Sequence, residues 1–141
     1  MATLTVTIQE QLTLNGKERG NVNTATFTVT EVDHRIIKIT STEQSILLFA
    51  AAVAAGTFKD GALEYLRITN LDGSANVDLR IRDAAQEYFV RIIPGGSFIL
   101  TEDKLDADAT GNDETLSLSQ IDSIKAVSSL STSDIEIFIA G

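Results

Sequence analysis

The stretch that decides the fold is LEYLRITNLDGSANVDLRIR, residues 63–82. Its two halves alternate apolar and polar side chains with a period of two, which places Leu66 and Ile68 on one face of the first half. This period is typical of a strand that buries one face. The Asp72-Gly73 pair between the halves indicates a tight turn, because glycine accepts positive φ. The stretch therefore predicts two strands that form a hairpin.

The same alternation extends to both ends of the chain. Asn15-Gly16 predicts a turn within a loop over residues 15–23, and Asp33-His34 predicts another turn. No amphipathic helix has the length that a βαβ crossover needs. With about nine or ten strands, the sequence predicts an all-β, antiparallel β-sandwich, jelly-roll-like, as a single domain over residues 1–141. The further strands are expected at residues 4–8, 24–32, 35–40, 88–93, 97–101, 116–118, 121–127 and 135–139.

One apolar, alanine-rich segment near residues 43–55 leaves two interpretations open. Alanine and leucine favour a helix, Ser41 with Gln44 would form a capping box, and Gly56 would end it. The segment has no polar face, however, which favours a strand at residues 46–50 followed by a loop. We expect the strand and keep one short helix near residues 43–55 as the alternative.

The bulk composition excludes several classes of partner. A net charge of −9, with the 11 lysines and arginines spread along the chain, argues against nucleic acid. The longest apolar run is about half the length of a membrane span, and the first residues lack signal-peptide features, so we expect neither membrane insertion nor export. Cysteine is absent, which excludes disulfides and thiolate metal sites.

The residues also offer no catalytic constellation. His34 is the only histidine and lies in a predicted turn, so a triad with a histidine base is not supported. The turn glycines do not begin a helix where a phosphate would bind, and no carboxylate pair lies in a motif for hydrolysis. We therefore expect no enzymatic activity and no cofactor.

An acidic stretch, residues 102–114, suggests cation binding only superficially. Asp106 and Asp108 stand at alternate positions before Gly111, as ligands do in a calcium loop. Position 12 of such a loop would be Ser117 instead of a bidentate glutamate, and no helices flank the segment. We predict a solvated acidic loop without a metal site, and leave cation binding open.

Opposite charges are segregated along the chain. Four arginines lie in the central strands, whereas carboxylates crowd the loop that follows. One hypothesis is that these regions meet head-to-tail across a subunit boundary. Pairing within the chain, or simple solvation, is the favoured alternative. The candidate interface residues are Arg67, Arg80, Arg82, Arg91, Asp106 and Asp108.

Three segments together carry a resemblance to a known group of proteins. YLRITNLD at 65–72, YFV at 88–90 and IPGGSFIL at 93–100 resemble a pattern in small structural proteins of tailed bacteriophages, especially cyanophages. The pattern covers roughly the middle quarter of the chain and reads strand, Asn turn, strand, Pro-Gly-Gly-Ser, strand. It describes a style of β-sandwich and is tied to no reaction.

The resemblance implies a capsid decoration or cement protein. Such a protein binds the outer surface of the phage head, often as a homotrimer, and bridges neighbouring copies of the major capsid protein. It would be made in the host cytoplasm and located in the virion. The family's contact residues cannot be transferred, because no motif here corresponds to them.

Two other functions stay open. A neck, tail or fibre component would use a similar sandwich. A carbohydrate-binding jelly-roll module would need exposed aromatic side chains in a groove, and the chain has no tryptophan, with only Tyr65 and Tyr88 as weak stacking candidates.

Overall fold

The computed structural model describes residues 1–52, 54, 56–84, 86–105 and 119–141. Every regular element in these ranges is a strand, so the all-β prediction is confirmed. Ten of the described strands have four or more residues, in agreement with the predicted nine or ten. The predicted strand at 116–118 lies outside the described residues. The strands are β1 Ala2–Gln9, β2 Thr13–Leu14, β3 Lys17–Glu18, β4 Val22–Val29, β5 Val32–Thr40, β6 Gln44–Ala50, β7 Thr57–Lys59, β8 Tyr65–Asn70, β9 Val77–Arg82, β10 Glu87–Ile92, β11 Ser97–Leu100, β12 Lys104–Leu105, β13 Ser119–Gln120, β14 Ser123–Ser128 and β15 Thr132–Ala140.

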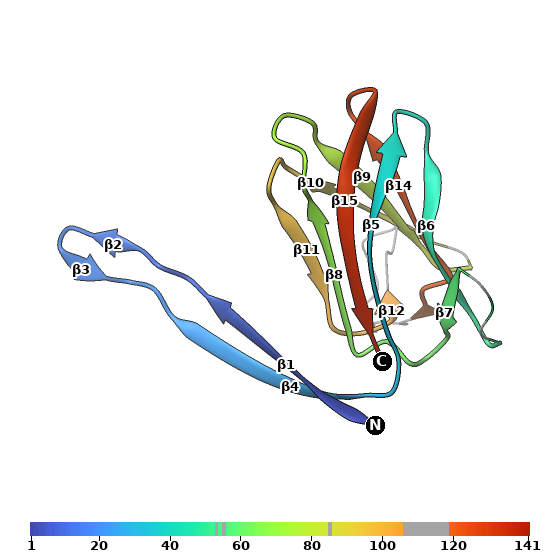
Figure 1. The fold of residues 1–141 in the computed structure, drawn as a ribbon, viewed down its shortest axis with the longest axis horizontal. Coiled ribbons are helices and arrows are strands. Elements are labelled where there is room, and N and C mark those ends of the chain that lie inside the picture. Colours follow the sequence, from blue (N-terminus) through green and yellow to red (C-terminus); the bar gives the residue numbers. More distant parts are fainter. Residues whose placement is uncertain (53, 55, 85, 106–118) are drawn as a thin grey trace, which may run out of the picture.

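Two sheets form the sandwich (Figure 1). The four-stranded sheet has the order β11-β8-β15-β5, and the five-stranded sheet has the order β10-β9-β14-β6-β7. The strands pair from the ends of the sandwich segment of the sequence towards its middle. β5 pairs with β15, β6 with β14, β8 with β11, and β9 with β10, all antiparallel. A chain folded back on itself in this way is a jelly roll. Only β6 and β7, among the described pairs, run parallel.

The core lies between the two sheets. The central strand β15 alternates strictly, and its three inward isoleucines, Ile135, Ile137 and Ile139, have no exposed surface. Each buried isoleucine contributes on the order of 1.5–3 kcal/mol through removal of apolar surface from water. Side chains from both sheets, and Ile121 from the segment before β14, complete this core: Ile39, Ile46, Leu47, Leu66, Ile68, Val77, Leu79, Ile81, Ile92 and Ile124.

The hairpin predicted within residues 63–82 is wrong, although both of its strands exist. β8 belongs to the four-stranded sheet and β9 to the five-stranded sheet, so the segment between them crosses the sandwich. The crossing is fixed by Asn70, whose side chain is fully buried. Its Nδ2 donates to the carbonyl oxygens of Ala75 at 2.7 Å and Ile92 at 3.3 Å, and its Oδ1 accepts from the N–H of Asp72 at 3.0 Å.

The strand expected at residues 46–50 is confirmed as part of β6, so the alternative of a short helix near residues 43–55 does not apply over Gln44–Ala50. Ile46 and Leu47 are both buried, at a register shift between β6 and β14. The turn predicted at Asp33-His34 is wrong, because both residues lie within β5.

The first 29 residues lie outside the sandwich. β1 and β4 pair along their whole length in a separate two-stranded sheet, and β2 with β3 continues the ribbon to its tip. Figure 1 shows this arm extending away from the two packed sheets. Asn15 and Gly16 both have positive φ, at 52° and 72°, which confirms the predicted turn. The loop predicted over residues 15–23 is shorter, because β3 and the start of β4 occupy part of it.

Candidate assembly surfaces

The arm has two faces of different chemistry. On one face threonines pair across the strands, Thr3 with Thr28, Thr5 with Thr26, and Thr7 with Thr24. The alternation of β-strands places apolar residues on the opposite face. We call this set the apolar face of the arm: Leu4, Val6, Ile8, Ala25 and Phe27.

The base of the arm is fixed to the sandwich. The ring centroid of Phe27 lies 5.9 Å from that of Tyr65, and Val29 is buried. The N–H groups of Thr30 and Glu31 donate to the carbonyl oxygen of Gly141 at 2.6 and 2.7 Å, and the N–H of Gly141 donates to Glu31 at 3.0 Å. These contacts set the direction in which the arm leaves the sandwich.

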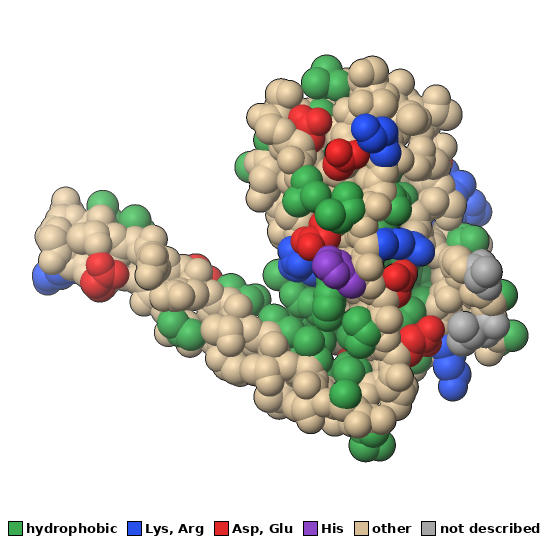
Figure 2. Space-filling view, in the orientation of Figure 1, with side chains coloured by type: hydrophobic (Ala, Val, Ile, Leu, Met, Phe, Trp, Pro, Cys, Tyr) green, Lys and Arg blue, Asp and Glu red, His purple; other side chains and the backbone are tan. Residues whose placement is uncertain are grey.

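Beyond its base the arm keeps apolar side chains in solvent. Ile8 is 42% exposed, Leu12 and Leu14 are each 53% exposed, and Val22 is 55% exposed. Figure 2 shows hydrophobic side chains gathered where the arm meets the sandwich and others on the surface of the arm. An isolated two-stranded ribbon is marginally stable in water. Contact with another molecule would therefore stabilise the arm.

The outer surface of the four-stranded sheet forms a second candidate surface. Its centre is Glu136, with His34 Nε2 at 2.8 Å from Oε1 and Arg67 Nη1 at 2.8 Å from Oε2. The single histidine and its charged neighbours are visible in Figure 2. Ile36 and Ile99 flank this group and are 61% and 39% exposed. We call this set the β5–β15 face: His34, Ile36, Arg67, Ile99, Glu136 and Phe138.

The hydrogen bond from His34, followed by the charge of Arg67, holds the pKa of Glu136 below its usual range. A lowered carboxyl pKa stabilises the folded state at pH values above the unfolded pKa, and that stability is lost as the pH falls through the folded pKa. We expect His34→Ala to raise the pKa of Glu136 towards its usual value. NMR titration, followed at the side-chain carboxyl carbon of Glu136, measures this change in pKa. An unchanged pKa would show that the contact between His34 and Glu136 does not persist in solution.

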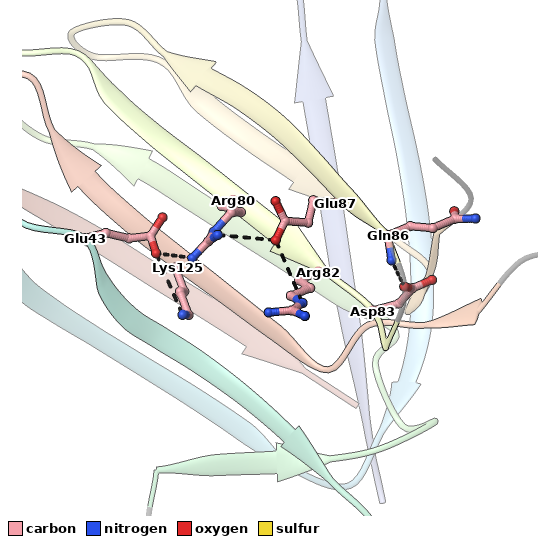
Figure 3. Close-up of polar contacts among 7 residues, drawn as sticks. All are labelled: Glu43, Arg80, Arg82, Asp83, Gln86, Glu87 and Lys125. Carbon is pink, nitrogen blue, oxygen red and sulfur yellow. Dashed lines mark hydrogen bonds and ion pairs between the residues drawn. The ribbon is translucent and has the colours of Figure 1, made fainter. Parts of the chain in front are cut away.

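The outer surface of the five-stranded sheet carries a ladder of ion pairs (Figure 3). Glu43 pairs with Arg80 and lies 3.7 Å from Lys125 Nζ. Glu87 lies 3.3 Å from Arg80 Nη1 and 3.9 Å from Arg82 Nε. The ladder thus joins the turn before β6 to three neighbouring strands.

The predicted arginines all have partners within the chain. Besides Arg80 and Arg82 in the ladder, Arg67 pairs with Glu136, and Arg91 donates two hydrogen bonds to Asp78 at 2.6 and 2.7 Å. Sequence reasoning missed these carboxylates, although Arg91 and Asp78 are direct cross-strand neighbours. Asp106 and Asp108 lie outside the described residues, so the head-to-tail hypothesis stays a prediction.

A third surface is apolar and lies at the edge of the five-stranded sheet. Phe89 on β10 is 65% exposed, Tyr88 is 46% exposed, and Ile93 in the following turn is 63% exposed. Phe89 and Arg91 line a shallow pocket of about 340 Å³ with Asp78 and Val90. Between β9 and β10, the N–H of Gln86 donates a hydrogen bond to Asp83 Oδ1 (Figure 3).

His34 and the acidic segment are the main features that sequence reasoning considered for catalysis or metal binding. His34 lies on β5 instead of in a turn, and its side chain is 54% exposed. Within the described ranges no group of three His, Asp or Glu side chains is arranged to hold a metal ion. The same ranges contain no helix with the length and apolar character needed to cross a membrane. The solvated acidic loop predicted over residues 102–114 is wrong where it is described, because Asp103 is buried and Lys104–Leu105 form β12. The rest of that segment, residues 106–114, lies outside the described residues.

No family model, curated protein or solved structure was found to match the chain. Its function is therefore inferred from the chain's own surfaces and from the resemblance of its central segments.

Proposed function

We propose that this chain is a non-enzymatic structural protein of a phage particle, a decoration or cement protein on the outer surface of the head. Its partner would be the major capsid protein, and it would reside in the virion. The observation that carries the proposal is the projecting arm with apolar side chains in solvent. A sandwich that acts alone has no use for such a ribbon, whereas an assembly component gains a contact surface from it.

The distribution of charge suits this role. Within residues 1–29, Glu10 and Glu18 balance Lys17 and Arg19, so the whole net charge of −9 belongs to the rest of the chain. Acidic sandwiches repel one another and stay soluble, while the neutral arm can approach another surface without this repulsion. On a repeating shell, many weak contacts of this kind add up to strong attachment.

Binding to purified empty heads tests the proposal. We expect saturable co-sedimentation with heads and a higher melting temperature of the decorated shell. The double substitution Ile8→Glu and Leu14→Glu should weaken binding at least tenfold, about 1.4 kcal/mol or more, because it places charge on the exposed arm. Leu130→Glu, at an exposed position of the sandwich, is the matched control and should bind normally.

Three results would contradict the proposal. Labelling of isolated tails without heads would favour a neck, tail or fibre component. Binding to a glycan panel, with no binding to heads, would favour a carbohydrate-binding module. Full binding by the arm variant would show that the arm is not the contact surface.

A further inference from the structure

We propose that the arm of one copy docks on the β5–β15 face of a second copy of this chain. The inference concerns contact between copies and does not depend on which shell, if any, the protein decorates. It begins from the reach of the arm. The eight residues of β1 span about 27 Å at the rise of an antiparallel strand. Only the base of this ribbon contacts its own sandwich, so the remainder is available to a neighbour.

The base of the arm already packs beside the receiving surface within each copy. Phe27 of the arm packs on Tyr65, whose ring lies 6.0 Å from that of Phe138 on the same sheet. Ile99 lies in the same cross-strand row as Phe138, and Ile36 lies in the next row. A second arm on these exposed isoleucines would extend an interface that the chain already forms with itself.

Electrostatics are compatible with a copy of this chain as the occupant. The charges on the β5–β15 face neutralise one another, since Glu136 pairs with His34 and Arg67. β1 carries no charged residue, so neither surface repels the other. Two sandwiches, in contrast, each carry the full net negative charge and oppose a direct sandwich-to-sandwich contact.

The edge strand β5 is protected against pairing with a further strand. This favours packing of the arm on the face of the sheet over addition of the arm beside β5. Arg35 Nη2 donates to the carbonyl oxygen of Ile46 at 2.6 Å, and Gln44 Nε2 donates to the carbonyl oxygen of Lys38 at 3.2 Å. These side chains bridge β5 and β6 where the two sheets meet. An inward-pointing charge such as Arg35 is a common protection of an edge strand against further pairing.

Because the chain has no cysteine, crosslinking between copies tests the proposal cleanly. Isotopically labelled Ile8→Cys protein and unlabelled Ile36→Cys protein are purified separately, mixed, and treated with a bismaleimide; the label is needed because the two variants otherwise have the same mass. We expect covalent heterodimers, identified by mass, at a yield at least ten times that of a mixture of Ile8→Cys with Phe89→Cys. Phe89 is as accessible as Ile36 but lies on the other sheet. Equal yields from the two mixtures, or no heterodimer in either, would overturn the proposal.

The mass of the unmodified protein in solution gives an independent measurement. We expect concentration-dependent association that Ile36→Glu weakens at least tenfold and that Phe89→Glu leaves unchanged. A monomer at all concentrations would overturn the proposal. Binding to empty heads is measured separately and could persist in that case, so the two proposals fail separately.

Discussion

Ile137→Ala should lower the free energy of unfolding by about 4 kcal/mol, the largest effect that we predict for a single substitution. Ile137 lies at the middle of β15, has no exposed surface, and is surrounded by core side chains from both sheets. The truncation removes apolar contacts and leaves a cavity that close-packed neighbours cannot fill. Urea unfolding followed by circular dichroism measures the change.

Ile93→Ala is the matched control, because it removes the same atoms from a side chain that is 63% exposed. We expect it to change stability by less than about 0.5 kcal/mol. If both variants lost the same stability, the assignment of Ile137 to the core between the sheets would be wrong.

Asn70→Ala should cost about 3 kcal/mol, because several buried partners lose their hydrogen bonds at once. The carbonyl oxygens of Ala75 and Ile92 would lose a donor, and the N–H of Asp72 would lose an acceptor. These groups belong to two different crossings between the sheets. Thermal unfolding should show the loss as a lower melting temperature.

Asn76→Ala is the control for this prediction. Asn76 lies in the same crossing and bonds through its backbone N–H to Ser129 Oγ, a contact that alanine keeps. It should unfold within about 0.5 kcal/mol of the unsubstituted chain. A near-neutral Asn70→Ala variant would mean that water or a rearranged loop replaces the lost hydrogen bonds.

The position of Asn70 also explains what two of the segments quoted for the resemblance do in this fold. Its backbone N–H donates to Gly96 at 3.0 Å, and the N–H of Gly95 donates to Asn70 at 3.1 Å. The Asn turn and the Pro-Gly-Gly-Ser turn therefore hold each other where the chain passes between sheets. The resemblance thus rests on residues that build the scaffold, which is why it supplies no contact residues.

The sequence by itself determined the strands. Strict alternation, as in the central strands and in β15, reports which side chains share the apolar face of a strand, because successive side chains point to opposite faces. The Asn15-Gly16 turn was equally readable, since both residues accept positive φ. The helix near residues 43–55 stayed an alternative, because an apolar run without a polar face has no periodicity to decide between helix and strand.

Only the tertiary structure decided which strands pair and which surfaces stay open. β8 and β9 have the local pattern of a hairpin, yet the buried bonds of Asn70 place them in different sheets. Likewise, β1 and β4 alternate as sandwich strands do, but pair only with each other. Alternation records that one face of a strand is apolar and carries no information on what covers it. The arm, and with it the proposed contact between copies, becomes visible only when every strand has been given its partner.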